Sequence, residues 1–145
     1  MLPFLSKTKT MGVCEYVTIH HVAVWTSDPE RLRDFYTTYF GARCGEPYRN
    51  KKTGFFSYFL SFDSGALLEI MHSSEIPPSA DDPEKQRLGL IHLAFSAGSK
   101  AAVDALTQRL VSDGYTLLSG PRWTGDGYYE SCLYDPDSNR IEITV

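Results

Sequence analysis

The apolar and polar positions of this chain follow an order of strand, helix and further strands that occurs twice. Residues 19–24 (IHHVAV) and 90–95 (LIHLAF) both alternate apolar and polar side chains, which predicts two short strands. Asp28 follows the first of these strands and Ser99 the second, and both residue types are favoured at the start of a helix. After each of them, apolar side chains recur at spacings of three and four residues, which is typical of a helix. The pattern therefore predicts two copies of one structural unit.

Each predicted helix carries its apolar side chains on one face. The first is expected over residues 29–40, because Pro29 suits the first helical position and Gly41 favours a helix end. The second is expected to run from Ser99 to a terminating Gly114. The predicted apolar faces comprise Leu32, Phe35, Tyr36, Tyr39 and Phe40 in the first helix, and Val103, Leu106, Leu110 and Val111 in the second.

Alternating strand sequences follow each helix, so each half reads as a strand, a helix and two or three strands. These sequences are 55–62 and 66–71 in the first half, and 128–134 and 140–145 in the second. We expect an N-terminal extension (1–16) and one domain (17–145), which consists of module one (17–73), a Pro- and Ser-rich linker (74–87) and module two (88–145). Neither half is long enough to bury a core alone, so the halves should pack side by side, about a pseudo-twofold axis.

Four of the predicted strands each place one potential metal ligand opposite their apolar face. His21 alternates with Val22 and Val24, and His92 follows His21 by 71 positions. A glutamate follows the two histidines after 48 and 50 positions, respectively. The candidate ligands are His21, Glu69, His92 and Glu142.

Four such side chains would be costly to turn inward without a metal or a polar network. Two imidazoles and two carboxylates suit Zn²⁺, Ni²⁺ or Co²⁺ better than Mg²⁺ or Ca²⁺, which prefer oxygen ligands alone. A carboxylate beside such an ion can accept a proton while the ion polarises a substrate oxygen. The pattern thus predicts a metal site where the halves meet and proton abstraction next to a carbonyl.

Composition narrows the class of protein. The chain has 145 residues, 42% of them hydrophobic, which fits one globular domain without a membrane span. A net charge of -4 makes nucleic acid an unfavourable partner. Cys14, Cys44 and Cys132 are odd in number and far apart, which argues against a disulfide framework and favours a cytoplasmic location. The N-terminus lacks the features of a signal peptide, and Met11 is an alternative start.

The sequence resembles the glyoxalase I-like branch of the vicinal oxygen chelate superfamily over residues 17–145. The motifs that carry the resemblance are HHVAVWTSDPE (20–30), LEI (68–70), IHLAF (91–95), DPD (135–137) and IEI (141–143). It implies an α+β fold in which two βαβββ modules form an open, cup-shaped mixed sheet with the helices on its outer face. It further implies a homodimer whose site lies within one chain or across the dimer interface.

The resemblance also implies one divalent metal ion, Zn²⁺ or Ni²⁺, with His21, Glu69, His92 and Glu142 as ligands. In glyoxalase I (lactoylglutathione lyase), the residue that matches Glu142 acts as the base for a hemithioacetal substrate. Bacterial glyoxalase I typically has Arg and Asn where this chain has Trp25 and Ser73, and both help to hold glutathione. The resemblance therefore covers the metal ligands and does not by itself imply that glutathione is recognised.

We predict that Trp25, Ser73 and Trp123 contact a small-molecule substrate, with Phe56, Tyr58 and Tyr129 as further pocket candidates. By strand alternation, His20 and His72 should face away from the ligands and be structural or surface residues. Two other functions fit the same scaffold. One is a non-catalytic ligand-binding protein of the bleomycin-resistance kind, and the other is an epimerase of acyl-CoA type, in which Gln usually replaces Glu69.

Overall fold

The computed structural model describes residues 16–145, so nearly all of the predicted extension, with Met11 and Cys14, lies outside the described residues. The chain order is β1 (His21–Trp25), α1 (Pro29–Phe40), β2 (Arg43–Cys44), β3 (Tyr48–Arg49), β4 (Phe56–Ser61), β5 (Leu67–His72), β6 (His92–Ser96), α2 (Lys100–Ser112), β7 (Leu117–Trp123), β8 (Tyr129–Tyr134) and β9 (Arg140–Thr144).

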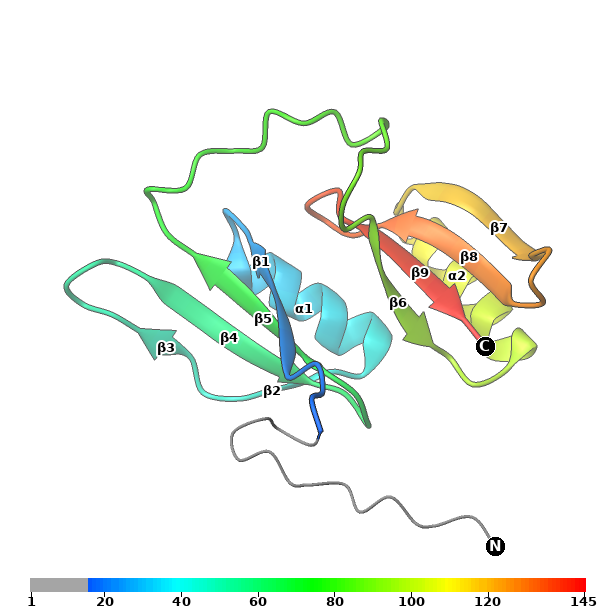
Figure 1. The fold of residues 1–145 in the computed structure, drawn as a ribbon, viewed down its shortest axis with the longest axis horizontal. Coiled ribbons are helices and arrows are strands. Elements are labelled where there is room, and N and C mark those ends of the chain that lie inside the picture. The colour runs from blue at the N-terminus through cyan, green and yellow to red at the C-terminus, as the bar shows by residue number, and fades with distance from the viewer. Residues whose placement is uncertain (1–15) are drawn as a thin grey trace, which may run out of the picture.

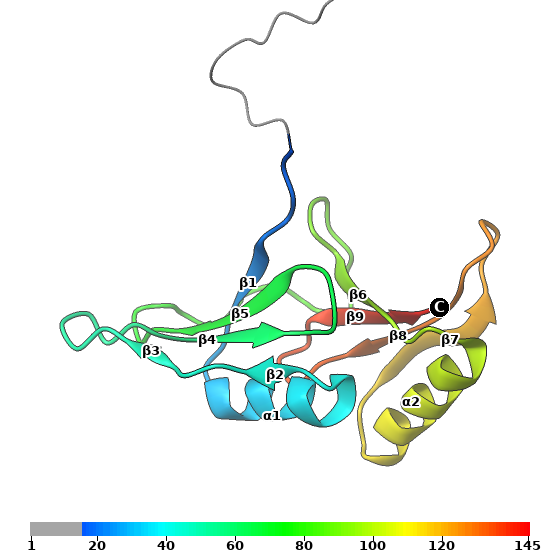
Figure 2. The same cartoon turned by 90° about the horizontal axis from the view of Figure 1, so that it is seen from below.

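The strands form two open mixed sheets, one in each half of the chain (Figure 1). The first has the order β1-β5-β4-β2, with β3 also paired to β4, and the second has the order β6-β9-β8-β7. β1 runs parallel to β5, β6 runs parallel to β9, and the other pairs are antiparallel. Both helices lie on the same side of the sheets (Figure 2). This arrangement confirms the predicted α+β fold with two related modules.

Helix α1 has the predicted bounds. The Asp28 carboxylate accepts a hydrogen bond from the backbone N–H of Arg31 at 3.0 Å, and Gly41 ends the helix with a φ of 63°. Leu32, Phe35 and Tyr36 are buried, as their spacing predicts.

Helix α2 differs from its prediction in two details. It ends at Ser112, with Asp113 rather than Gly114 as its cap. Val111 was assigned to the apolar face but is 44% exposed. One residue advances a helix by about 100°, so the side chain that follows buried Leu110 points away from the sheet.

Strand β7 was not predicted, because it contains the dipeptide Gly120–Pro121, a combination that usually ends a strand. β7 lies at the edge of its sheet, where its register against β8 is irregular. Gly120 has a φ of 83° and lies so close to β8 that a Cβ atom would be 2.4 Å from the carbonyl oxygen of Glu130. Because Gly120 has no Cβ, β7 can lie this close to β8. The low strand preference of glycine and proline would by itself predict no strand here.

The two modules are joined chiefly through α1. The rings of Phe40 and Phe95 lie 4.6 Å apart, and those of Phe35 and Tyr115 lie 4.9 Å apart. The Tyr36 hydroxyl donates to the Asp135 carboxylate at 2.9 Å. These contacts join module one to strand β6 and to the α2–β7 and β8–β9 connections of module two, so the relative position of the modules is set by packing and not by the linker.

Asp135 offers a test of this junction. Its side chain is buried, and its carboxylate also accepts hydrogen bonds from the backbone N–H groups of Asp137 and Asn139 and from the Asn139 amide. Burial raises the pKa of Asp135, and these hydrogen bonds act in the opposite direction. We expect Asp135→Ala to lower the free energy of unfolding by about 2 to 4 kcal/mol, because it leaves several buried donors without a partner.

Urea denaturation followed by circular dichroism would measure this loss. Asp113→Ala is the matched control, because Asp113 also accepts a hydrogen bond from a tyrosine, Tyr39, but at an exposed position. The control should lose less than about 1 kcal/mol. Equal losses in the two variants would contradict the importance of burial at Asp135.

Candidate metal centre

His21 and Glu69 come together on neighbouring parallel strands of module one. In the β1–β5 register, Ala23 lies directly opposite Glu69, and His21 occupies the next position on the same face. Nε2 of His21 lies 3.7 Å from Oε2 of Glu69. The histidine side chain is 39% exposed and the glutamate side chain 13%, so the pair is shielded from one side and accessible from the other.

His92 and Glu142 repeat this geometry in module two. Ala94 lies opposite Glu142 in the β6–β9 register, and Nε2 of His92 lies 3.6 Å from Oε2 of Glu142. The exposed fractions of the two side chains, 38% and 16%, are close to those of the first pair. The duplication therefore reproduces the geometry and the solvent exposure of the His–Glu pair as well as its residue types.

Two neighbours orient the His21 ring. Nδ1 of His21 lies 2.8 Å from Nδ1 of His20, which leaves Nε2 directed toward Glu69. Phe59 contacts the same ring edge to face, with ring centroids 5.5 Å apart. Hydrogen bonding at the second ring nitrogen is the usual way in which a ligating histidine is held in position.

The prediction that His20 faces away from His21 is therefore wrong. Strand β1 begins at His21, so strand alternation does not extend to His20. His72 does have a structural contact, since its Nδ1 lies 2.9 Å from the carbonyl oxygen of Thr26.

Sequence reasoning missed the residues that stand beside the two glutamates on the next strand. Phe59 on β4 lies opposite Glu69, and Cys132 on β8 lies opposite Glu142. Burial raises the pKa of the Cys132 thiol. Burial, and next the Glu142 carboxylate, raise the pKa of Glu130 on the same strand. Only the strand register could have identified these neighbours.

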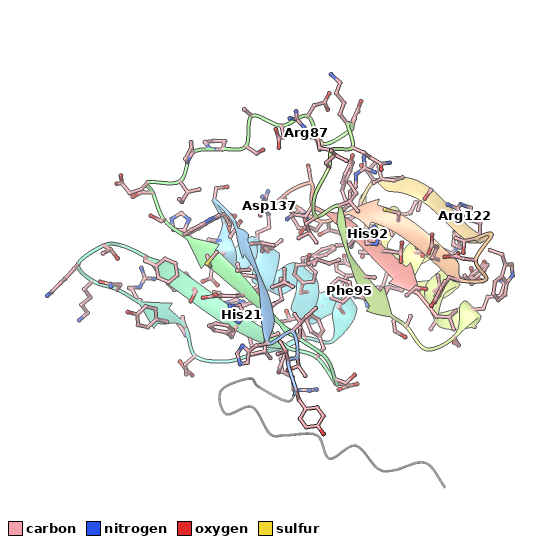
Figure 3. All side chains as sticks on the ribbon, viewed as in Figure 1. His21, Arg87, His92, Phe95, Arg122 and Asp137 are labelled. Atoms are coloured by element: carbon pink, nitrogen blue, oxygen red, sulfur yellow. The ribbon has the colours of Figure 1, made fainter. Side chains whose placement is uncertain are left out.

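The two His–Glu pairs do not meet within one chain. His21 and His92 lie on separate sheets (Figure 3). Across residues 16–145, the structure contains no group of three or more His, Cys, Asp or Glu side chains placed to hold a metal ion. One chain thus presents two half-sites, each with one imidazole and one carboxylate.

Each half-site has donors of a kind that suits a divalent ion. Two ligands that each lie about 2.1 Å from one Zn²⁺ ion are separated by roughly 3.0 to 3.5 Å. The nitrogen-to-oxygen separations of 3.7 and 3.6 Å are slightly longer than this range and too long for hydrogen bonds. The donor types and spacing therefore fit half of a four-ligand metal site.

The predicted substrate-contacting residues lie near strand ends. Trp25 ends β1, is 43% exposed and contacts Phe55 edge to face. Trp123 ends β7 and is 63% exposed, whereas Ser73 follows β5 and accepts a hydrogen bond from the backbone N–H of Glu75.

Three further pocket candidates are corrected by the structure. Phe56, Tyr58 and Tyr129 are at most 7% exposed and belong to the hydrophobic core. The Tyr58 hydroxyl donates to Glu30 and that of Tyr129 to Asp104, so both hydroxyls are engaged with the helices. Strand alternation places these rings on the helix side of the sheets, opposite the His–Glu pairs.

Together, the duplicated modules define a two-module α+β protein with one imidazole–carboxylate pair on each sheet. The chain belongs to the Glyoxalase/Bleomycin resistance protein/Dioxygenase superfamily, whose family model matches residues 18–143. No helix among residues 16–145 combines the length and the apolar character needed to cross a membrane.

Individual relatives agree with this assignment. Uncharacterized protein YqjT of Bacillus subtilis (strain 168) is 29% identical over 130 residues, which cover 88% of this chain and 98% of YqjT. The glyoxalase family protein from Enterococcus faecalis has a TM-score of 0.67 at 25% identity, covering 88% of this chain and 96% of that protein. The trypanothione-dependent glyoxalase I of Leishmania major shares the fold, with a TM-score of 0.69 at 17% identity and coverages of 88% and 86%.

Proposed function

We propose that this protein is a metal-dependent lyase or isomerase of the glyoxalase I kind. It moves a proton next to a carbonyl of a small substrate that presents two neighbouring oxygens. The observation that carries the proposal is the repeated His–Glu pair, with nitrogen-to-oxygen distances of 3.7 and 3.6 Å.

A second copy of the chain completes the site in this proposal. In the described part of the chain, β1 and β6 are the terminal strands of their sheets, and each carries the histidine of its half-site. In a twofold-symmetric dimer, the His21–Glu69 pair of one copy faces the His92–Glu142 pair of the other. The symmetry then generates two equal sites, each with two imidazoles and two carboxylates.

The four side chains share one task, and Glu142 has a second. His21, Glu69, His92 and Glu142 would hold a divalent ion, with Zn²⁺ or Ni²⁺ as the expected metals. When bound, that ion supplies positive charge that stabilises the negative charge left by proton removal. Glu142 accepts the proton from the substrate carbon and returns it to the neighbouring carbon. Its side chain is 16% exposed, which lets substrate reach the carboxylate while limiting access of water.

Substrate contacts are assigned to residues at the rim of the sheets. Trp25 and Trp123 offer exposed aromatic surface, and Ser73 follows the strand that carries Glu69. Trp25 and Ser73 replace the residues with which bacterial glyoxalase I typically holds glutathione. We therefore expect the thiol part of any adduct to be recognised differently here.

Metal binding is the direct test of this function. Purified protein that is reconstituted with Zn²⁺ or Ni²⁺ should hold about one equivalent per chain, as measured by elemental analysis. Removal of the ion with a chelator should lower the melting temperature, because the ion binds only the folded state.

The control for this experiment is the double variant His21→Ala/Glu69→Ala, which removes one half of every site. It should lose most of the bound metal and keep its circular dichroism spectrum. Less than about half an equivalent of any divalent metal in the reconstituted wild-type protein would refute the metal-dependent function.

A further inference from the structure

A second concave site lies on the opposite side of the sheets from the His–Glu pairs. A cavity of about 490 Å³ opens between the modules. Val22 and Leu68 line it, and they alternate along β1 and β5 with the candidate ligands His21 and Glu69. Leu106 of α2 and Phe40 of α1 line it from the helix layer. The cavity thus lies against the helix side of β1 and β5 and extends to the edge of β6, where Ala94 and Ser96 also line it.

The hydrophobic core is incompletely closed at this cavity. Phe40, Phe62, Leu93, Phe95 and Leu106 all pack against the core, yet each is only partly buried. The ring centroids of Phe40 and Phe62 lie 4.6 and 5.3 Å from that of Phe95, so the three rings form a continuous aromatic wall. Figure 3 shows Phe95 on the side of β6 that faces module one. Apolar surface of this kind gains stability when it is covered.

The cavity wall is more apolar than polar and carries little charge. Five consecutive residues, 93–97, line the cavity. Because successive side chains of a strand point to opposite faces, a consecutive run of this kind indicates that the backbone edge of β6 faces the cavity. Within residues 16–145, β6 pairs with β9 alone, so no second strand of the described chain covers that edge. The one charged residue in the lining, Asp63, is 3.0 Å from the Arg43 guanidinium, which balances its charge.

We propose that this cavity binds a flat, uncharged, mainly apolar small molecule that carries one hydrogen-bonding group. The aromatic wall suits a ring system, and the edge of β6 can pair with a single donor or acceptor. A volume of 490 Å³ falls within the range of about 300 to 1,000 Å³ that is usual for small-molecule sites. A concave shape of this size accepts such a molecule better than it accepts the flat surface of a second protein.

Binding of N-phenyl-1-naphthylamine, a neutral fluorescent probe with one N–H donor, tests this proposal on the full-length protein. The probe should gain fluorescence in a saturable titration. Leu106→Trp fills the cavity and should weaken binding by about tenfold or more. Val111→Trp makes the same type of change on the exposed side of the same helix and should alter the affinity by less than about twofold.

Amide chemical shifts of the wild-type protein give a readout that does not depend on any variant. The probe should shift the amides of residues 63–67 and 93–97 more than those of Phe59 and Cys132, which lie opposite Glu69 and Glu142 and do not line the cavity. Phe59→Ser, a change on the His–Glu face, should leave the affinity unchanged. Because none of these measurements involves a metal, a failure of probe binding can be told apart from a failure of metal binding, which tests the proposed enzymatic function.

Three outcomes would overturn the proposal. One is a loss of probe binding in Phe59→Ser but not in Leu106→Trp, which would place the probe on the other face. Another is probe binding that disappears as the protein concentration is raised and the chain associates, which would assign the cavity to a second copy. The third is binding only after removal of residues 1–15, which would assign the cavity to the chain's own N-terminal segment.

Discussion

Replacing Glu142 with glutamine is expected to abolish most of the proton exchange at the substrate carbon while the protein keeps much of its metal. Glutamine retains an oxygen that can contact the ion but is not a base. The rate should fall by about 100- to 10,000-fold, the usual contribution of a positioned general base. The loss should appear in the turnover number of metal-loaded protein, since this residue acts on the reacting proton itself.

Proton exchange can be followed by nuclear magnetic resonance in D₂O, with hemithioacetals formed from methylglyoxal and a panel of thiols as substrates. Glu69→Gln is the matched control, because Glu69 occupies the equivalent position in module one and has nearly the same exposure. It should weaken metal binding and have less effect on the fully loaded protein. Full activity in Glu142→Gln would refute the role of Glu142 as the base.

The second large effect is expected when two defective variants are combined. The double variants His21→Ala/Glu69→Ala and His92→Ala/Glu142→Ala each break every site of their own homodimers. A mixed dimer of the two should contain one intact site and one site that lacks all four ligands. With random pairing of equal amounts, about a quarter of the wild-type metal sites and activity should return.

Subunits can be exchanged by co-expression or by refolding the two variants together, and restored sites can be counted by elemental analysis. The unmixed variants, treated in the same way, provide the baseline. A site built within one chain cannot be restored by mixing, because no chain then carries all four ligands. Mixing without any gain in bound metal would therefore disprove the shared site.

Local sequence patterns predicted most of the secondary structure. Helix α1 could be predicted to the residue, because Asp28, Pro29 and Gly41 mark its ends by short-range effects on the backbone. β7 could not be predicted, since Gly120 and Pro121 are tolerated there only through close packing of an edge strand against β8. The cap of α2 shifted by one residue, which is within the usual variation of helix ends.

The sequence also predicted that each module pairs a histidine with a glutamate, and the structure places both pairs within 4 Å. This prediction depends on strand alternation, a property of a few consecutive residues. Phe59 and Cys132 were missed as neighbours of the glutamates, because the strand register involves residues distant in sequence. His20 was misplaced because alternation does not extend beyond the first residue of β1.

By itself, the sequence determined the duplication, the elements and the residue types of the two half-sites, because these follow from local periodicity and spacing. The tertiary structure decided where the half-sites lie. Contacts between residues far apart in the chain, such as Phe40 with Phe95 and Tyr36 with Asp135, join the modules through α1 and keep the two pairs apart. Such contacts depend on the packing of whole surfaces, which no local pattern specifies.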